Sequence, residues 1–476
     1  MKFQTSLYLI FLTLMWVVFA AARKPSLRRL ALLVASYLFY FTWGPAFLVV
    51  LIASSVFNFL WGRVLLRRPL TSLLWLGLGA NILLLASFKY AGWLLGAFTI
   101  SNSLLTNILG AVGVSFYTFQ GMSHLLDVYR EVEHPTPTLV EFLLYMAFWP
   151  TVLSGPICRV GELIPQFRRM STPALDDVST GVQRILFGLF MKVVLADTLG
   201  FGLLAGEGVN TGFNSISKGW SGVDVWFLAI GFGFQLYFDF AGYSHMAIGS
   251  ARLFGIQLRE NFNHPYISLT PSDFWTRWHM SLSFWIRDYL FLPLAMRRRE
   301  FSWRILATIF SMTVFGIWHG AGANFLLWGV YHGVLLAGHR ILQQFGRRIR
   351  GDVERFRFLG LGKRIASWTV TFLLICLGWV LFRANNLAQA GAMLRAVFAP
   401  RGYFKPTLRP NFYVLIICVV AGYFGYMALR QLWRSFERYP VVARLGWAVS
   451  PVLYCAQIVA IIVWSRQAAT FVYLQF

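Results

Sequence analysis

Charge is scarce in this 476-residue chain: only 13% of its residues are charged, and Asp and Glu together number 18. Globular domains carry about 25% charged residues, so soluble domains of this length are excluded. Hydrophobic residues make up 58% of the chain, and apolar runs long enough for membrane helices recur from one end to the other. The sequence therefore predicts an all-α polytopic membrane protein.

Cysteine is also rare, with four residues in no paired spacing: Cys158, Cys376, Cys418 and Cys455. This pattern excludes a disulfide framework and a cysteine-based metal site. The chain has no P-loop, no nucleophile elbow and no zinc-protease histidine pair. Its histidines have no metal-ligand spacing either, so we expect neither a metal nor a bound cofactor.

Basic residues are the abundant charged class, with 42 Lys and Arg giving a net charge of +24. In a soluble protein this excess would suggest nucleic acid. Here the basic residues stand in short blocks between apolar runs, at 23–29, 297–299 and 347–364. The positive-inside rule expects such blocks in cytoplasmic loops. We therefore predict contact with the lipid bilayer and none with nucleic acid. A second use is phosphate binding on a cytosolic donor, with Arg297, Arg298 and Arg299 as candidates.

The apolar runs indicate about 10–13 crossings within a single membrane domain over residues 1–476. Several runs are short, which predicts a thinned membrane or re-entrant segments. Residues 31–61 hold Gly44-Pro45 at their centre, which predicts two short helices that turn there. A basic block directly follows the first run, so we expect a retained first helix and not a cleaved signal peptide. The runs lie at about 5–22, 30–43, 46–61, 70–98, 104–126, 138–153, 180–204, 223–250, 303–318, 322–342, 365–383, 412–432 and 447–464.

Ionisable residues inside apolar runs are costly, and they mark candidate sites. Asp239 is flanked by aromatic residues on both sides, so we expect a buried carboxylate that orients a histidine or an arginine. Lys192, Asp197, His124 and Asp127 lie near predicted helix ends. For these four residues snorkelling or pairing at the membrane interface is the expectation.

The segment "GIWHGAGANFLLWGVYHG", residues 316–333, places His319 directly before a run of Gly and Ala. Small residues permit a helix break and close helix packing. A broken helix at membrane depth must be packed in protein or line an aqueous cavity. We predict a polar niche in which His319 is a general base for an attacking hydroxyl. For His332 both a packing role and a supporting role at the site stay open.

The segment "DFWTRWHMSLSFWIRDYLFLPLAMRRR" has the periodicity of an amphipathic helix. His279, Ser283 and Arg287 follow one another at i, i+4 and i+8 and predict a polar line on one face. Trp275 and Trp278 belong to an apolar stripe on another face. This pattern fits an interfacial helix without chemistry, and it equally fits the wall of a water-filled pocket.

Six motifs in fixed order resemble the membrane-bound O-acyltransferase family, and within it the alginate O-acetylation branch. They span residues 113–390, and the resemblance implies about eleven transmembrane helices with re-entrant or horizontal helices around a funnel. The family's catalytic histidine, in a W-H-G motif, maps onto His319, and a second family histidine, in R-W-H-x-S-L-S, maps onto His279. The motifs are "GVSFYTFQGMSHLLDVYR", "FWPTVLSGPICR", "FDFAGYSHMAIGSARLFGI", "NFNHPYISLTPSDFWTRWHMSLSFWIRDYLFLPL", "GIWHGAGANFLLWGVYHG" and "GWVLFRANNLAQA".

The resemblance also implies a reaction. An acetyl group would pass from cytosolic acetyl-CoA across a bacterial inner membrane to a periplasmic, esterase-like (SGNH-type) partner, which O-acetylates a polysaccharide. His279 would position or polarise the thioester carbonyl, supported by Asn261, Asp239 or Arg287, with Ser283 and His332 as further candidates. His245 stands where an Asp is expected in this branch, which leaves acceptor details at that position open.

Two alternatives remain from the sequence. "RWHMSLSFWIRD" is also close to the teichoic-acid D-alanylation branch of the family, so D-alanyl transfer is one. The other is a transporter for a lipid-linked or sugar substrate, a class that shares buried charges and broken helices. A transporter of that kind predicts repeat symmetry between the two halves, and the sequence shows no internal repeat.

Overall fold

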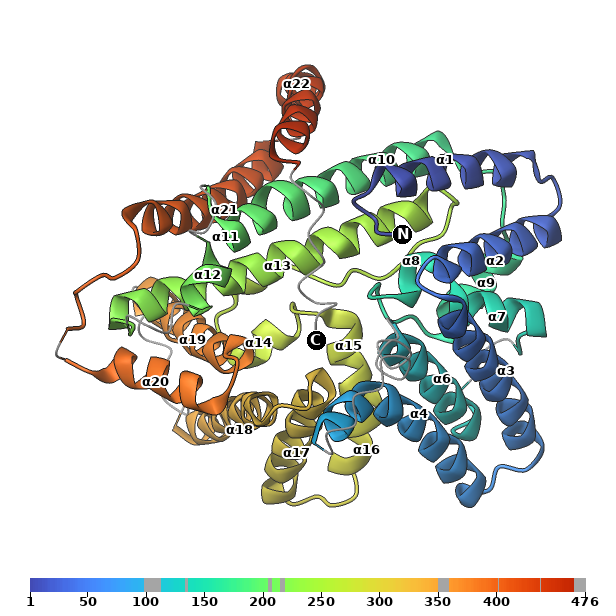
Figure 1. Cartoon of the computed structure of the whole chain (residues 1–476), viewed down its shortest axis with the longest axis horizontal. Helices are drawn as coiled ribbons and strands as arrows, with labels where there is room; N and C mark the ends of the chain where they lie inside the picture. Colours follow the sequence, from blue (N-terminus) through green and yellow to red (C-terminus); the bar gives the residue numbers. More distant parts are fainter. Residues whose placement is uncertain are drawn as a thin grey trace. The chain divides into compact units, whose positions relative to one another are not determined.

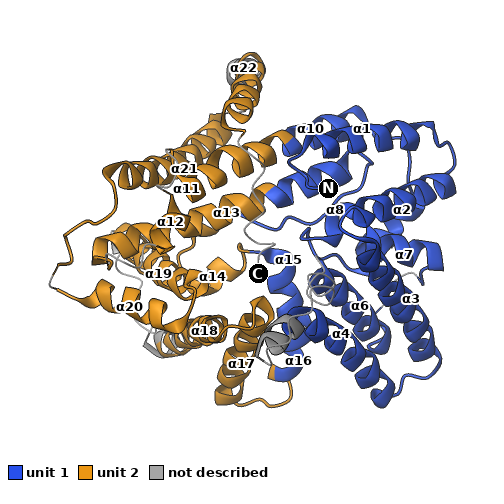
Figure 2. Ribbon diagram, viewed as in Figure 1, with its two compact units in different colours: residues 1–185, 243–263, 279–294 blue, residues 186–242, 264–278, 295–476 orange. Residues whose placement is uncertain are grey.

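The computed structural model describes residues 1–97, 113–132, 136–203, 208–214, 219–349, 359–400, 402–436 and 438–465. All regular elements within these ranges are helices, which confirms the predicted all-α class (Figure 1). The chain divides into two compact units that alternate along the sequence (Figure 2). Unit 1 comprises residues 1–185, 243–263 and 279–294, and unit 2 comprises residues 186–242, 264–278 and 295–476.

Seven of the described helices are long and apolar enough to cross a membrane, so the prediction of a polytopic membrane protein is confirmed. Shorter apolar helices accompany them at Ser6–Ala21, Leu387–Phe398 and within Pro440–Trp464. The seven are α3 (Pro45–Arg67), α4 (Thr71–Ala97), α13 (Gly222–Arg252), α17 (Phe301–His319), α18 (Ala323–Ile349), α19 (Leu359–Arg383) and α21 (Pro410–Phe436).

Unit 1 confirms the predicted turn at Gly44-Pro45, but the prediction of two short helices is wrong for α3, which has 23 residues. The preceding helix ends at Phe41 and α3 begins at Pro45. Gly44 has a φ of 143°, a conformation that side chains disfavour, and Pro45 occupies the first helical position, where its missing N–H is not needed. The other unit 1 helices are α1 (Ser6–Ala21), α2 (Pro25–Phe41), α6 (Val114–Tyr129), α7 (Leu139–Ala147), α8 (Trp149–Val152), α9 (Val160–Arg168), most of α10 (Leu175–Leu189), α15 (Met280–Ile286), the π-helix η4 (Arg287–Phe291) and most of α16 (Leu292–Ala295).

Unit 2 contains the predicted break after His319. Helix α17 ends at His319 and α18 begins at Ala323. The two helices pack closely because a Cβ on Gly316 would lie only 2.8 Å from Cα of Gly329, which leaves room for glycine alone. Unit 2 also includes η1 (Phe190–Ala196), α11 (Asp197–Phe201), α12 (Val209–Asn214), α14 (Pro271–Trp275), α20 (Leu387–Phe398) and α22 (Pro440–Trp464).

The predicted continuous helix around His279 is wrong. Helix α14 ends at Trp275 and α15 begins at Met280. His279 precedes α15 with φ 42° and ψ 53°, a left-handed conformation that cannot continue a right-handed helix. From Arg287 the backbone forms a π-helix, which shifts the helical register. The i, i+4, i+8 line of polar residues therefore does not exist as one helical face.

Candidate functional site

The first candidate site lies in unit 1, where His279 meets Asn261. Both side chains are buried, with 1% and 0% of their surface exposed. Nδ1 of His279 lies 2.9 Å from Oδ1 of Asn261. The same oxygen accepts bonds from the hydroxyl of Ser281 at 2.9 Å and from its backbone N–H at 3.4 Å. The amide nitrogen of Asn261 donates to the Ser244 hydroxyl at 3.1 Å. Asn261 therefore holds the imidazole and the first turn of α15 together.

This arrangement fixes the tautomer of His279. A backbone N–H can only donate, so the Asn261 atom facing Ser281 is the amide oxygen. That oxygen accepts the hydrogen of His279 Nδ1, which leaves Nε2 with a lone pair. Burial lowers the pKa of His279 to about 3, so the ring is neutral at pH 7. The ring can accept a proton or a hydrogen bond at Nε2, but it has no N–H there to polarise a carbonyl oxygen.

The backbone of His279 supports a functional role. A left-handed conformation outside glycine costs of order 1 kcal/mol and persists where the surroundings impose it. Here the surroundings are the Asn261 side chain and its carbonyl oxygen, which accepts the Met280 N–H at 2.8 Å. The strained turn therefore interrupts the helix between α14 and α15 and holds the His279 imidazole against Asn261.

The second candidate site lies in unit 2, around His319. This residue is 5% exposed and ends α17. Aromatic rings surround its imidazole, with centroid distances of 4.8 Å to Phe315 and Trp318 and 5.1 Å to Trp328 and Phe382. The helix break thus places the histidine inside an aromatic cage.

His332 lies behind the same cage. Its ring centroid is 4.9 Å from Trp328, so this tryptophan contacts both histidines. His332 is fully buried, and among the described residues neither of its ring nitrogens has a hydrogen-bond partner. A Cβ on Gly378 would lie 2.7 Å from Nε2, so only glycine there leaves space for the ring. The unsatisfied nitrogens favour a role beyond packing.

Asp239 lies in a different environment from the one predicted. Its carboxylate is 2.7 Å from Nζ of Lys192, which is also 2.8 Å from Asp197. The expected partner was a histidine or an arginine, and the observed partner is this lysine. Lys192 is fully buried, so pairing was the correct expectation and snorkelling was wrong. Lys192 stands in the π-helix η1, and π-turns are frequent at functional sites.

The remaining predicted residues have separate surroundings. Arg287 pairs with Asp288 at 2.7 Å, and its side chain is 54% exposed. Arg297, Arg298 and Arg299 are exposed in the link that precedes α17, where Arg298 lies 4.8 Å from the Trp303 ring. Ser283, in α15, is partly buried.

His124 and Asp127, near a predicted helix end, and His245 have surroundings of their own. His124 and Asp127 are buried in α6, and the Tyr289 hydroxyl lies 2.8 Å from Asp127. His245 lies 3.3 Å from a nitrogen of Arg184. In the part of the chain that the structure describes, no group of three or more His, Cys, Asp or Glu is placed to hold a metal ion.

Sequence reasoning missed the supports that act across the chain. Ser281 and Ser244 were not associated with Asn261, and Lys192 was not associated with Asp239. In each of these contacts the two residues are distant in sequence, and the unexpected turn at His279 also separates Asn261 from Ser281. Only the burial of a lone charge, which demands a counter-charge, signalled that Asp239 needed a partner.

Comparison with known proteins agrees with these motifs. The profile of "MBOAT, membrane-bound O-acyltransferase family" matches residues 1–382. A probable alginate O-acetylase AlgI of Pseudomonas putida is 35% identical over 78% of this chain and 75% of its own length. The peptidoglycan O-acetyltransferase of Helicobacter pylori is 32% identical over 80% of this chain and 76% of its own.

A teichoic acid D-alanyltransferase of Bacillus subtilis is 28% identical over 58% of this chain and 69% of its own length. The names of these three relatives all describe acyl transfer, with alginate, peptidoglycan and teichoic acid as the named polymers. The chain therefore belongs to the membrane-bound O-acyltransferase family and is a multi-pass membrane acyltransferase.

Proposed function

We propose that the protein moves an acetyl group from cytosolic acetyl-CoA across the bacterial inner membrane for O-acetylation of an extracytoplasmic polysaccharide such as alginate. A periplasmic, esterase-like (SGNH-type) partner receives the acetyl group and delivers it to the glycan. Two relatives named for O-acetyl transfer, to alginate and to peptidoglycan, support acetyl as the acyl group.

The chemistry needs a base and a way to hold the thioester. The acceptor hydroxyl loses its proton to His319 while its oxygen attacks the thioester carbonyl. The C–S bond breaks, and the departing thiolate takes the proton back from the imidazole. No covalent bond to the enzyme forms. The aromatic cage around His319 keeps bulk water away from the imidazole. Water that reached this base would otherwise hydrolyse the thioester donor.

His279 positions the donor in this scheme. Its Nε2 lone pair accepts a hydrogen bond, and the arm of an acyl-thioester donor carries amide N–H groups. The observation that carries the proposal is this neutral, buried imidazole, whose tautomer Asn261 fixes. Asp239 acts through its ion pair with Lys192, and His332 acts through Trp328.

The alternative acyl group is D-alanyl, because a teichoic acid D-alanyltransferase is among the relatives of this chain. The same residues serve either acyl group, since both arrive as thioesters and leave as esters. Purified protein offered labelled acetyl-CoA or a labelled D-alanyl thioester, each with the acceptor, distinguishes the two. A transporter consumes neither thioester.

The test of the base is His319→Ala, with His339→Ala as the control. His339 lies in α18 and bonds to Gln343 at 2.9 Å, outside the aromatic cage. Loss of a general base costs about 10²–10⁴-fold in rate, so His319→Ala protein should purify normally and transfer almost no acetyl. The control should transfer acetyl at the wild-type rate. Near-full activity of His319→Ala would show that another group is the base.

A further inference from the structure

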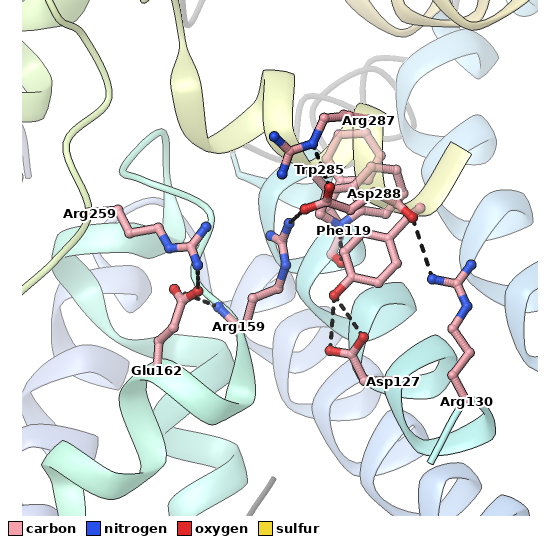
Figure 3. Close-up of polar contacts among 10 residues, drawn as sticks. Phe119, Asp127, Arg130, Arg159, Glu162, Arg259, Trp285, Arg287 and Asp288 are labelled. Carbon is pink, nitrogen blue, oxygen red and sulfur yellow. Dashed lines mark hydrogen bonds and ion pairs between the residues drawn. The ribbon is translucent and has the colours of Figure 1, made fainter. Parts of the chain in front are cut away.

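Four arginines of unit 1 lie near one another, at the end of α6, the start of α9, the segment after α13 and the start of η4 (Figure 3). We call Arg130, Arg159, Arg259 and Arg287 the arginine cluster. Three carboxylates accompany them, Asp127, Glu162 and Asp288. Four positive charges against three negative ones leave one positive charge in excess.

Arg159 is the most enclosed member of the cluster. It is 9% exposed, and Nη2 lies 3.6 Å from Asp288, beyond hydrogen-bond distance. Among the described residues neither terminal nitrogen of Arg159 has a hydrogen-bond partner. A buried guanidinium without hydrogen bonds is costly. Its two terminal nitrogens form a fork that matches a phosphate or a carboxylate.

The ring of Tyr289 forms a platform under this arginine. Cζ of Arg159 lies 4.7 Å from the ring centroid, and Cζ of Arg130 lies 5.6 Å from it. The Tyr289 hydroxyl bonds to both oxygens of Asp127, at 2.8 and 2.9 Å. Asp127 thus fixes the platform by its contact with Tyr289.

The other arginines border Arg159. Arg287 bonds to Asp288 at 2.7 Å, and Arg130 bonds to the Asp288 backbone oxygen at 3.4 Å. Arg259 pairs with Glu162, a carboxylate whose second oxygen accepts the Arg159 backbone N–H at 3.2 Å. Each flanking arginine is held by a close contact with a carboxylate or a carbonyl, whereas the terminal nitrogens of Arg159 have only the 3.6 Å ion pair of Nη2 with Asp288. Arg159 therefore keeps N–H donors for a ligand.

The positive-inside rule predicts that the cluster lies on the cytoplasmic side. The segment after α6 is contacted by basic side chains, Arg63 at the Pro137 carbonyl and Arg168 at the Thr136 carbonyl. Arg28, from the basic block at 23–29, bonds to the Met170 carbonyl just beyond α9. An anion that reaches this cluster therefore comes from the cytosol or from the inner leaflet.

The distance from the cluster to His279 suits one kind of ligand. Helix α6 runs beside α15 and η4 in the same direction: the Phe116 ring lies 6.4 Å from His279, Phe119 stacks on Trp285 at 4.2 Å, and Asp127 bonds to Tyr289. At 1.5 Å per residue, Phe116 and Asp127 are about 16 Å apart along the helix. A phosphopantetheine arm has peptide-like spacing, and it spans about 15 Å between phosphate and sulfur when extended.

We propose that the arginine cluster, through the Arg159 fork, binds the phosphate ester at the base of a phosphopantetheine thioester donor. This inference rests on the proposed function, and it replaces the exposed Arg297, Arg298 and Arg299 as the donor-phosphate site. With its phosphate on Arg159, the extended arm places the thioester at the level of His279. The same chemistry would also recognise an anionic lipid headgroup.

The experiment compares two donors on the purified full-length protein: acetyl-CoA and acetyl-pantetheine, which lacks the phosphate. The wild type should prefer acetyl-CoA in kcat/KM. Arg159→Gln should reduce that preference about ten-fold or more, mainly through KM. Arg287→Gln, at an exposed position, should reduce it in the same direction and serves if Arg159→Gln does not fold. Arg252→Gln is the matched control, an arginine of unit 1 that pairs with Asp177 at 2.8 Å.

The outcomes separate the cluster from the reaction. If the wild type consumes acetyl-CoA while Arg159→Gln and Arg287→Gln keep its preference, the cluster assignment is overturned and the proposed function stands. Loss of the preference in Arg298→Gln instead would also overturn it. If the wild type consumes no thioester, the proposed function itself fails. The lipid alternative is tested in nanodiscs with and without phosphatidylglycerol. If the cluster binds an anionic lipid headgroup, Arg159→Gln should remove the effect of phosphatidylglycerol on activity and leave the donor preference unchanged. That result would overturn the donor assignment.

Discussion

Replacing Asn261 by alanine is the most direct test of how the His279 imidazole is set. The substitution removes the oxygen that accepts bonds from the ring, the Ser281 hydroxyl and the Ser281 backbone N–H. All three donors are in a buried site, and each unsatisfied buried donor costs about 1–3 kcal/mol. The serine hydroxyl can rotate to another acceptor, so we expect a total loss of about 2–4 kcal/mol in the free energy of unfolding.

The same substitution should change the tautomer. Without the Asn261 amide oxygen, no acceptor keeps the hydrogen of the His279 ring on Nδ1. The hydrogen can then move to Nε2, which loses its lone pair as an acceptor. We expect the rate of thioester consumption to fall about 10²-fold, a smaller loss than the wrong tautomer causes in a serine protease triad. The measurements are kcat/KM with acetyl-CoA and thermal unfolding, both on purified protein in detergent.

Two variants make the prediction specific. Asn261→Asp keeps an acceptor for the ring and for Ser281, so it should retain most of the activity. Ser244→Ala removes only the acceptor of the amide nitrogen, 3.1 Å away, so it should lower stability more than rate. Wild-type activity in Asn261→Ala, or equal inactivity of the Asp and Ala variants, would refute the argument from the tautomer.

Two other predictions concern charge. Lys192→Met leaves two carboxylates, Asp239 and Asp197, without their cation, and it should lower the free energy of unfolding by about 3–5 kcal/mol. Adding Asp239→Asn to this variant should restore part of the lost stability. A loss below about 1 kcal/mol for Lys192→Met in a denaturant titration would contradict a buried triad. Burial, followed by the charges of Arg430 and other nearby arginines, lowers the pKa of His264 to about 4. The contribution of the neutral His264 ring to stability is therefore complete above about pH 6.5. It is lost as the pH falls toward 4. The thermal midpoint of the wild type should therefore drop as the pH falls from about 6.5 to about 4. The drop should be less steep in His264→Asn, a substitution that tolerates the φ of 47° at this position. Equal slopes of midpoint against pH in the two proteins would show that His264 does not contribute.

The helices and the family could be predicted from the sequence. Hydropathy locates the membrane helices, because a bilayer imposes length and apolar character on each helix separately. Gly44-Pro45 and the small residues after His319 predict helix breaks at the observed places, because these residues act through the local backbone. The ordered motifs identify the acyltransferase family without any coordinates.

The turn at His279 could not be predicted from local pattern. Between Thr276 and His279 no glycine or proline signals a break, and the helical periodicity continues across it. The left-handed residue is imposed by Asn261, whose side chain and carbonyl bind the segment from outside. A contact over that sequence separation has no signature in a periodicity of 3.6 residues.

The sequence by itself predicted a polytopic membrane protein, the helix breaks at Gly44-Pro45 and after His319, and the family to which the chain belongs. Its thirteen apolar runs exceed the seven described helices that are long and apolar enough to cross a membrane. The tertiary structure decided which side chains meet: Asn261 with His279, Lys192 with Asp239, and Arg159 with Tyr289 and Asp288. The physical reason is range. Hydropathy and backbone preference act within one helix, whereas ion pairs and buried hydrogen bonds form between helices that only packing brings together.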